Sequence, residues 1–305
     1  MKMNVTLSPD TPCGCKSGLP YGKCHKPIFD ASEEDMLSVA WRLYAEAWAT
    51  NADHYQSQGV SASLAGQLAN AGDIGRVLDI GSGRGHGLAA LRDALQPEAR
   101  IIGVDENPEC LAAAAQLLGV EALPENVRRA DNRVLPNGYL MSTYPEGNLI
   151  DQGSVTLVQS DVIVQDRALD RLLNTVGPFD AISLWFSGVH KARSATEIAR
   201  HFKVKSDADN RELVEDRVLS VAGERLRPGG VLHLVNRVGA INIKAIGHEI
   251  AQTYGEWLED MPFKLEAFSA ISYQEPEGGV LVRSTDAGIN AMPNYAISML
   301  IRRHG

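Results

Sequence analysis

An aspartate and three glycines stand where an apolar run gives way to a helical pattern. Asp79 lies in the apolar run 77–80, and Gly81, Gly83 and Gly85 follow it. Apolar residues then recur at helical spacing, at Leu88, Leu91 and Leu95. Glycine allows a sharp turn and close approach by a ligand, and a helix N-terminus offers free N–H groups to polar oxygens. The stretch predicts a strand, a turn and a helix that bind a nucleotide-type cofactor; a purely structural turn is the plainer alternative.

The glycine spacing argues against an NAD fingerprint. The pattern GxGxxG needs a third glycine where this sequence has His86 or Leu88 in the two natural registers. A GxGxxA match at Gly85, Gly87 and Ala90 lies too far into the expected helix to form its first turn. An NAD-dependent oxidoreductase is therefore the weaker interpretation.

The pattern DxGxGxG, which begins at Asp79, resembles motif I of the class I S-adenosylmethionine-dependent methyltransferases. An acid beside open backbone groups suits a zwitterionic methionine tail better than a pyrophosphate. The resemblance implies that Asp79, Gly81, Ser82 and Gly83 contact S-adenosylmethionine. It also implies an α/β fold, a Rossmann-like sheet of seven strands that is mostly parallel with an antiparallel last strand, flanked by helices.

Two further acids follow later predicted strands. Asp105 ends the apolar run 101–104, where an acid accepts hydrogen bonds from the two ribose hydroxyls of an adenosyl ligand. Glu106 beside it is a further cofactor-binding candidate. The resemblance assigns Asp161, after the predicted strand 155–158, to the adenine amino group and the next residue, Val162, to the face of the ring.

Residues 121–153 do not fit a repeating strand–helix pattern. Prolines and glycines surround the short run 138–144, which predicts a hairpin or irregular insertion on the substrate side. Asp131 in this segment competes with Asp161 for the adenine role. Its neighbours Arg128 and Arg129 are unsuited to a central strand, so we rank it second.

The segment after the predicted fourth strand, 179–184, carries the catalytic candidates Trp185, Ser187 and His190. In an open parallel sheet the chemistry lies beyond this end of the strands, and Trp185 is expected to border the cofactor as well. His190 is a candidate general base because its ordinary pKa is near neutrality, although many loop histidines are simply solvated. A sulfonium methyl group is already activated, so positioning and desolvation can supply much of the rate.

A basic segment follows at 190–205, which contains five Lys or Arg residues and a single acid, Glu197. It suggests an anionic methyl acceptor that contacts Lys191 and Arg193; an exposed basic helix is the alternative.

Near the N-terminus, Cys13, Cys15, Cys24 and His25 place four zinc-type ligands within thirteen residues. Their spacing, CxCx8C(C/H), resembles the SEC-C motif, the zinc-binding element at the C terminus of the SecA translocation ATPase. The resemblance implies structural zinc and a docking role toward protein partners.

The whole chain has 305 residues, 44% of them hydrophobic, and a formal net charge of -9. The negative charge disfavours broad nucleic-acid binding, and no apolar run suggests a membrane span or a signal peptide. We therefore expect a cytoplasmic protein with a zinc module at 1–30, a helical lid at 31–75 and a methyltransferase domain at 76–305.

The lid is expected to contain a helix that starts at a capping box of Ser32 and Asp35. Its aromatic residues Tyr44, Trp48 and Tyr55 are candidates to cover the cofactor or to pack on the sheet. Further along the chain the sequence predicts helices at 108–118 and 209–226 and a fifth strand, containing His233, after the Pro228–Gly229–Gly230 turn. Two final strands are expected at 263–273 and 295–302.

Together these features predict an S-adenosylmethionine-dependent methyltransferase whose acceptor is a small molecule or a protein. The alternative is a non-catalytic adaptor that binds the cofactor and docks to partners through its zinc module.

Overall fold

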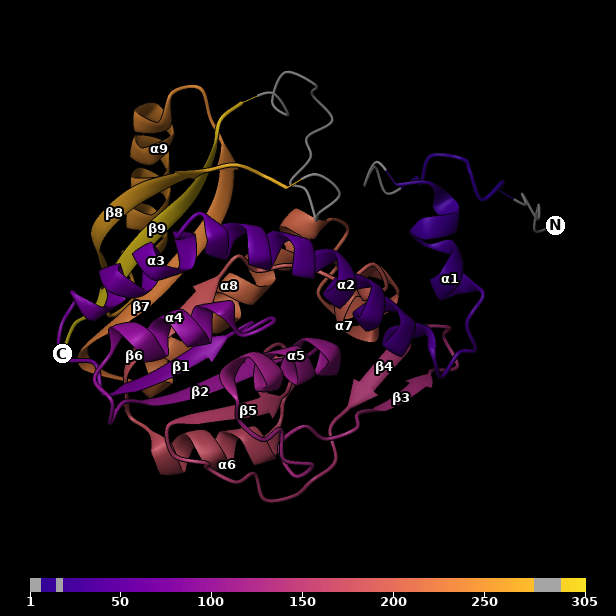
Figure 1. Ribbon diagram of the computed structural model, residues 1–305, viewed down its shortest axis with the longest axis horizontal. Helices are drawn as coiled ribbons and strands as arrows, with labels where there is room; N and C mark the ends of the chain where they lie inside the picture. The colour runs from indigo at the N-terminus through magenta and orange to yellow at the C-terminus, as the bar shows by residue number, and fades with distance from the viewer. Residues whose placement is uncertain (1–6, 15–18, 277–291) are drawn as a thin grey trace.

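The computed structural model describes residues 7–14, 19–276 and 292–305. Within them a sheet of seven strands has the order β5-β2-β1-β6-β7-β9-β8 (Figure 1). The strands are β1 Arg76–Ile80, β2 Arg100–Asp105, β5 Val155–Gln159, β6 Phe179–Trp185, β7 Leu226–Gly239, β8 Phe263–Tyr273 and β9 Asn294–Arg303. The first five lie parallel, and β9 runs antiparallel to both β7 and β8. The expected fold class is confirmed.

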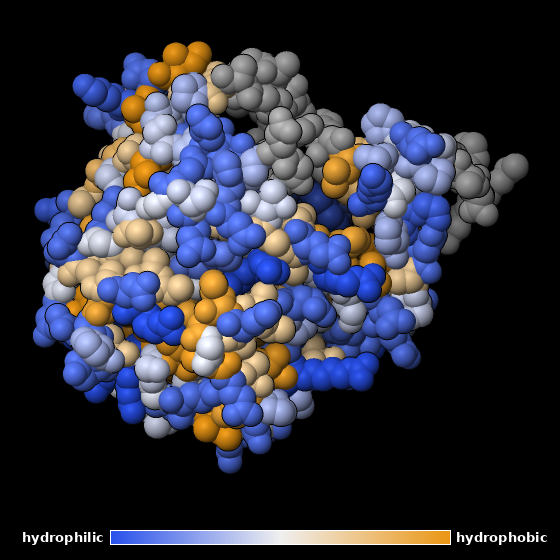
Figure 2. Space-filling model, viewed as in Figure 1, coloured by the Kyte–Doolittle hydropathy of each residue, from blue (hydrophilic) through white to orange (hydrophobic). Residues whose placement is uncertain are grey.

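The parallel strands are apolar on both faces because helices cover both sides of the sheet. On one side Val77 and Ile101 pack against α2 Met36–Ser57, α3 Val60–Ala69, α4 His86–Ala94 and α5 Pro108–Leu118. On the other side Leu78 and Ile102 pack against α6 Arg167–Val176, α8 Asp207–Arg225 and α9 Ile243–Trp257. On the face shown in Figure 2, polar residues predominate and apolar residues are scattered among them.

The helix α2 begins at Met36, four residues later than the capping-box prediction. The prediction is wrong because the Ser32 hydroxyl donates a 2.6 Å hydrogen bond to the Asp35 side chain, and no side chain caps the helix. The helix α9 is absent from the sequence prediction. It carries apolar residues at helical spacing, at Ile243, Ile250 and Trp257, so this sequence signal was present but not used.

The predicted insertion contains an antiparallel hairpin, β3 Asp131–Val134 with β4 Leu140–Thr143. Asp131 lies in this hairpin. Four short helical segments complete the described fold: η1 Tyr21–Lys23, α1 Lys26–Phe29, η2 Arg193–Ala195 and α7 Glu197–His201. Among the described helices, none combines the length and apolar character needed to cross a bilayer.

Candidate functional site

A pocket with about 740 Å³ of empty space, partly open to solvent, lies at the carboxyl ends of β1, β2, β5 and β6. It brings together most of the predicted site residues: Gly81, Gly83, Asp105, Glu106, Asp161, Val162, Trp185, Ser187 and His190. Asp79 and Ser82 line a smaller adjoining pocket that shares Gly81, Gly83 and Trp185 with the first. Residues far apart in the sequence therefore meet at one edge of the sheet.

The glycine turn is held against the end of β2. Gly81, Gly83 and Gly85 all have positive φ angles, of 71°, 53° and 84°. The N–H of Gly81 donates to the Val104 carbonyl at 2.8 Å, and the N–H of Gly83 donates to Asp105 Oδ2 at 2.8 Å. Glycine suits this turn because other residues rarely adopt such angles.

Asp105 organises the turn and still offers acceptor sites to the pocket. Its Oδ1 accepts a hydrogen bond from the N–H of Asn107 at 2.8 Å, while its Oδ2 holds Gly83. Each oxygen has two lone pairs, so one on each remains for a ligand hydroxyl. Burial raises the pKa of Asp105 to about 6, and the N–H groups of Asn107 and Gly83 limit the rise.

Asp79 is a buried acid beneath the smaller pocket, with an exposed fraction of 3%. Its Oδ1 accepts a 2.6 Å hydrogen bond from the Ser183 hydroxyl. Burial raises its pKa to about 7, although the hydroxyl groups of Ser183 and Ser82 favour the charged form. A cationic ligand group next to Asp79 would stabilise the carboxylate.

We expect Asp79→Asn to stabilise the ligand-free chain at alkaline pH. The pKa of Asp79 is raised on folding, so its stabilising contribution is complete below its ordinary pKa of 3.8 and is lost as pH rises through about 7. Asparagine carries no charge, so the variant should exceed the wild type by about 4 kcal/mol in unfolding free energy at pH 8, at about 1.4 kcal/mol for each unit of pKa. The difference should shrink toward pH 4. Urea unfolding at several pH values measures it, with the exposed Asp93→Asn as control; a gap that stays constant with pH would contradict the expectation.

A buried ion cluster of Arg193, Asp161 and Glu106 lines the same pocket. Arg193 donates to Asp161 Oδ2 at 2.8 Å and to Glu106 Oε1 at 2.7 Å. Burial alone would lower the pKa of Arg193, but the charges of Asp161 and Glu106 outweigh it and the pKa is raised. Burial raises the pKa of Glu106 to about 7, and Arg193 opposes that rise.

This cluster corrects the expectation that Arg193 belongs to an exposed basic patch. Its exposed fraction is 6%, and its charge is already matched by two carboxylates. Arg200, further along the same segment, pairs with Glu197. Neither arginine is therefore an unpaired cation available to an anionic acceptor.

His190 is buried rather than solvated, with an exposed fraction of 4%. Burial and the charge of Arg193 hold its pKa well below the ordinary value, so the imidazole is neutral at pH 7. Its Nε2 lies 3.7 Å from Glu106 Oε2. A neutral imidazole in the pocket can accept a proton, but its low pKa makes it a weak base.

The aromatic residues of α2 reach the site. Tyr44 and Trp48 line the main pocket and stack with ring centroids 6.4 Å apart, and Tyr55 lines the smaller pocket with Trp48. Trp185 lines both pockets and donates its indole N–H to His233 Nδ1 at 3.2 Å. These contacts place α2 against the glycine turn.

Several pocket residues were not predicted as part of the site, among them Asn107, and Asn210 and Val214 of α8. Asn107 follows the acid pair at the end of β2, a position that does signal proximity to the site. Nothing in the sequence places α8 there, because that contact depends on the packing of the whole sheet.

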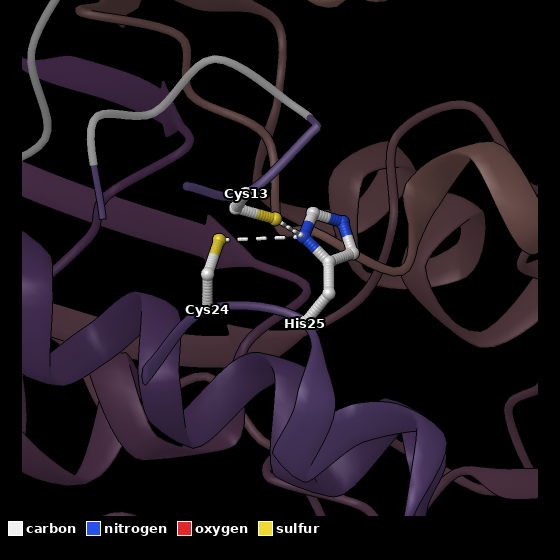
Figure 3. Close-up of side chains that lie close together, drawn as sticks. All are labelled: Cys13, Cys24 and His25. Atoms are coloured by element: carbon white, nitrogen blue, oxygen red, sulfur yellow. Dashed lines mark hydrogen bonds between the residues drawn. The ribbon is translucent and has the colours of Figure 1, made fainter. Parts of the chain in front are cut away.

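A second candidate site lies in the N-terminal segment, where Cys13, Cys24 and His25 form what we call the thiol–imidazole group (Figure 3). His25 Nδ1 lies 3.1 Å from Cys13 Sγ and 3.3 Å from Cys24 Sγ. Bonds of about 2.3 Å to sulfur and about 2.0 Å to nitrogen put neighbouring ligands of tetrahedral zinc about 3.5 Å apart. Zinc therefore fits after small shifts. Cys15, the fourth predicted ligand, lies outside the described residues.

The ligand geometry depends on tight local folding. The N–H of Cys13 donates to the Leu19 carbonyl at 2.9 Å, and that of Cys24 donates to the Tyr21 carbonyl at 3.1 Å. A Cβ atom on Gly22 would lie 2.8 Å from Pro9 Cβ, so only glycine fits there. Both thiols are thereby buried and face one imidazole nitrogen.

No protein-family model matches the sequence, and no curated protein sequence matches it. Among solved structures, one from Bacillus halodurans C-125 that is named only as a methyltransferase has 15% identity and a TM-score of 0.46, over 81% of this chain and 100% of its own. The N-methyltransferase NodS from Bradyrhizobium japonicum WM9, in complex with S-adenosyl-L-homocysteine, has 13% identity and a TM-score of 0.41, over 81% and 86%. The mitomycin 7-O-methyltransferase MmcR has 15% identity and a TM-score of 0.43, over 98% and 74%. Likeness at this level assigns no activity to the chain.

Proposed function

We propose that the protein is an S-adenosylmethionine-dependent methyltransferase. The observation that carries the proposal is the glycine turn tied by its Gly83 N–H to Asp105, beside the buried acid Asp79. This arrangement provides a carboxylate for a ribose, a second carboxylate for an ammonium group, and a backbone that a ligand can approach closely. The pocket at the carboxyl ends of the parallel strands is where an open α/β sheet binds its ligands.

When bound, S-adenosylmethionine supplies a methyl group activated by a sulfonium charge. In the proposed arrangement Asp79 stabilises the ammonium group of the methionine tail and Asp105 accepts hydrogen bonds from the ribose hydroxyls. Trp185 and Ser187 border the reacting methyl group at the end of β6. Tyr44 and Trp48 shield the pocket from water, so that positioning and desolvation supply the acceleration.

The adenine end of the proposed site is already well packed. Asp161 accepts from Arg193 through Oδ2 and from the N–H of Ile163 through Oδ1, at 2.8 and 3.0 Å. Each oxygen retains one lone pair, and one of these is proposed to accept the adenine amino group. Val162, which lines the pocket, packs against the ring. Arg193 fixes the orientation of Asp161 in this scheme.

The methyl acceptor is proposed to be a small molecule or a protein that approaches the end of β6. His190 is neutral there and can take up a proton from an oxygen or nitrogen nucleophile, but a sulfonium donor does not require a base. Zinc at the thiol–imidazole group, with Cys15 as fourth ligand, completes the proposal. Its proposed role as a SEC-C-like docking element, and a cytoplasmic location, suit thiols that remain reduced.

Isothermal titration with S-adenosylmethionine, S-adenosylhomocysteine and NAD tests the proposal. We expect the first two to bind at micromolar concentration, and Asp105→Ala to weaken both at least tenfold, because a hydrogen bond to a charged group contributes about 1.5–3 kcal/mol. Asp131→Ala is the control, since this exposed acid lies in the β3–β4 hairpin. Binding of NAD alone would overturn the proposal. Cofactor binding without transfer to any acceptor in a screen would favour the adaptor.

A further inference from the structure

The thiol–imidazole group lies close to the wall of the cofactor pocket. The next helix, α1, contributes Ile28, whose exposed fraction is 1%. Ile28 belongs to an apolar cluster with Leu37 and Trp41 of α2 and with Ala192. Ala192 lies in residues 186–196, the β6–α7 loop. The N-terminal segment is thus packed directly on this loop.

A second contact joins the same two segments through a metal ligand. A hydrogen bond joins the His25 side chain to the backbone of Lys191 in this loop. Because His25 Nδ1 faces the two sulfur atoms, the other ring nitrogen is the one available to the loop. A partner on the second nitrogen fixes the tautomer and orientation of a histidine that binds metal.

The opposite side of the β6–α7 loop faces the pocket. His190 and Arg193 line it, and Arg193 bonds to Asp161 and Glu106. Trp41 contacts both the loop and the end of β2. Its ring packs edge-on against the His190 ring, with centroids 6.4 Å apart, and its backbone carbonyl accepts a 2.8 Å hydrogen bond from Asn107 Nδ2. A continuous chain of contacts therefore leads from Ile28 to the end of β2, where Asp105 lies.

The described part of the N-terminal segment buries few apolar side chains. Among its described residues, 7–14 and 19–30, the buried apolar side chains are Cys13, Cys24 and Ile28. So small a core does not order a chain segment without a disulfide or a metal. The free energy of metal binding would therefore become ordering energy for this segment.

We propose, on the basis of the proposed function, that metal at the thiol–imidazole group braces the β6–α7 loop, so that zinc and the cofactor strengthen each other's binding. Ile28 and His25 transmit the effect to the loop, and Arg193 transmits it to Asp161. The zinc site then regulates cofactor affinity in addition to any docking role. Coupling between two sites is reciprocal, so each ligand changes the affinity of the other by the same factor.

The test measures, on the full chain, how zinc changes the affinity for the cofactor product and how that product changes the affinity for zinc. S-adenosylhomocysteine is titrated into zinc-loaded and chelator-stripped protein, and zinc affinity is measured by competition with a chromogenic chelator, with and without saturating S-adenosylhomocysteine. We expect about a tenfold change in each direction. Equal affinities in both comparisons, or no stoichiometric zinc binding, would overturn the inference while leaving the proposed function in place. No S-adenosylhomocysteine binding even by zinc-loaded protein would overturn the proposed function itself.

The variant Ile28→Ala tests the route through α1 and leaves the metal ligands in place. It keeps the thiol–imidazole group, so zinc should still bind, but the coupling factor should fall toward one. Ile241→Ala is the matched control, because Ile241 has an exposed fraction of 79%. Full coupling in Ile28→Ala would overturn the proposed route through α1.

Discussion

Replacement of Arg193 by alanine is expected to lower the free energy of unfolding by about 3–5 kcal/mol at pH 7, the range for breaking one side of a buried ion pair. Arg193 is buried and bridges Asp161 and Glu106. Without the guanidinium, two carboxylates would face each other with no cation between them. Urea unfolding of the ligand-free variant measures the loss.

The loss should depend on pH in a defined direction. Without Arg193 the pKa of Glu106, already raised to about 7, should rise further, so stability is lost as pH increases through that value. The deficit should therefore be larger at pH 8 than at pH 5. Arg200→Ala is the matched control, because its pair with Glu197 is partly exposed and solvent screens it, so its loss should be much smaller. Equal losses of unfolding free energy in the two variants would contradict the expectation that the ion pairs of Arg193 are buried.

Gly85→Ala is expected to destabilise the chain by about 2–5 kcal/mol, the sum of a left-handed backbone cost and overpacking. Gly85 has φ of 84° and caps the N-terminus of α4. A Cβ atom there would lie 2.8 Å from Ala114 Cβ and 2.9 Å from Ala114 Cα, both in α5. The two helices would have to separate, and the shift in thermal midpoint reports the cost.

Gly119→Ala separates the two contributions. Gly119 ends α5 with φ of 66°, but nothing lies within 4 Å of its Cβ position. It should therefore show only the backbone cost, about 1–2 kcal/mol. A loss in Gly85→Ala no greater than this would show that α4 and α5 are not closely packed through Gly85.

The gathering of the predicted site residues at one pocket could be foreseen because they lie at strand ends. Asp105 and Asp161 each follow an apolar run, and the carboxyl ends of parallel strands meet at one edge of a sheet. The glycines of the turn are recognisable because a positive φ restricts the residue type. The sheet itself follows from the same apolar runs.

The residues that the sequence misassigned depend on long-range packing. A guanidinium in a basic segment gives no local sign that Asp161 and Glu106 will enclose it, so Arg193 was expected at the surface. The serine at position 32 suits a helix cap, but its hydroxyl bonds to Asp35 instead. The helix α9 is a different case, because its apolar residues do recur at helical spacing, at Ile243, Ile250 and Trp257, and the helix could have been predicted.

The position of β9 has a consequence for the order of assembly during synthesis. β9 lies between β7 and β8, although it follows both in the chain. Within the described sheet β8 pairs with β9 alone, so it has no neighbour until residues 294–303 have left the ribosome. The five parallel strands can form earlier, since their partners are already present. On the ribosome, the five parallel strands should therefore be ordered before β8, which joins the sheet only when β9 has inserted between it and β7.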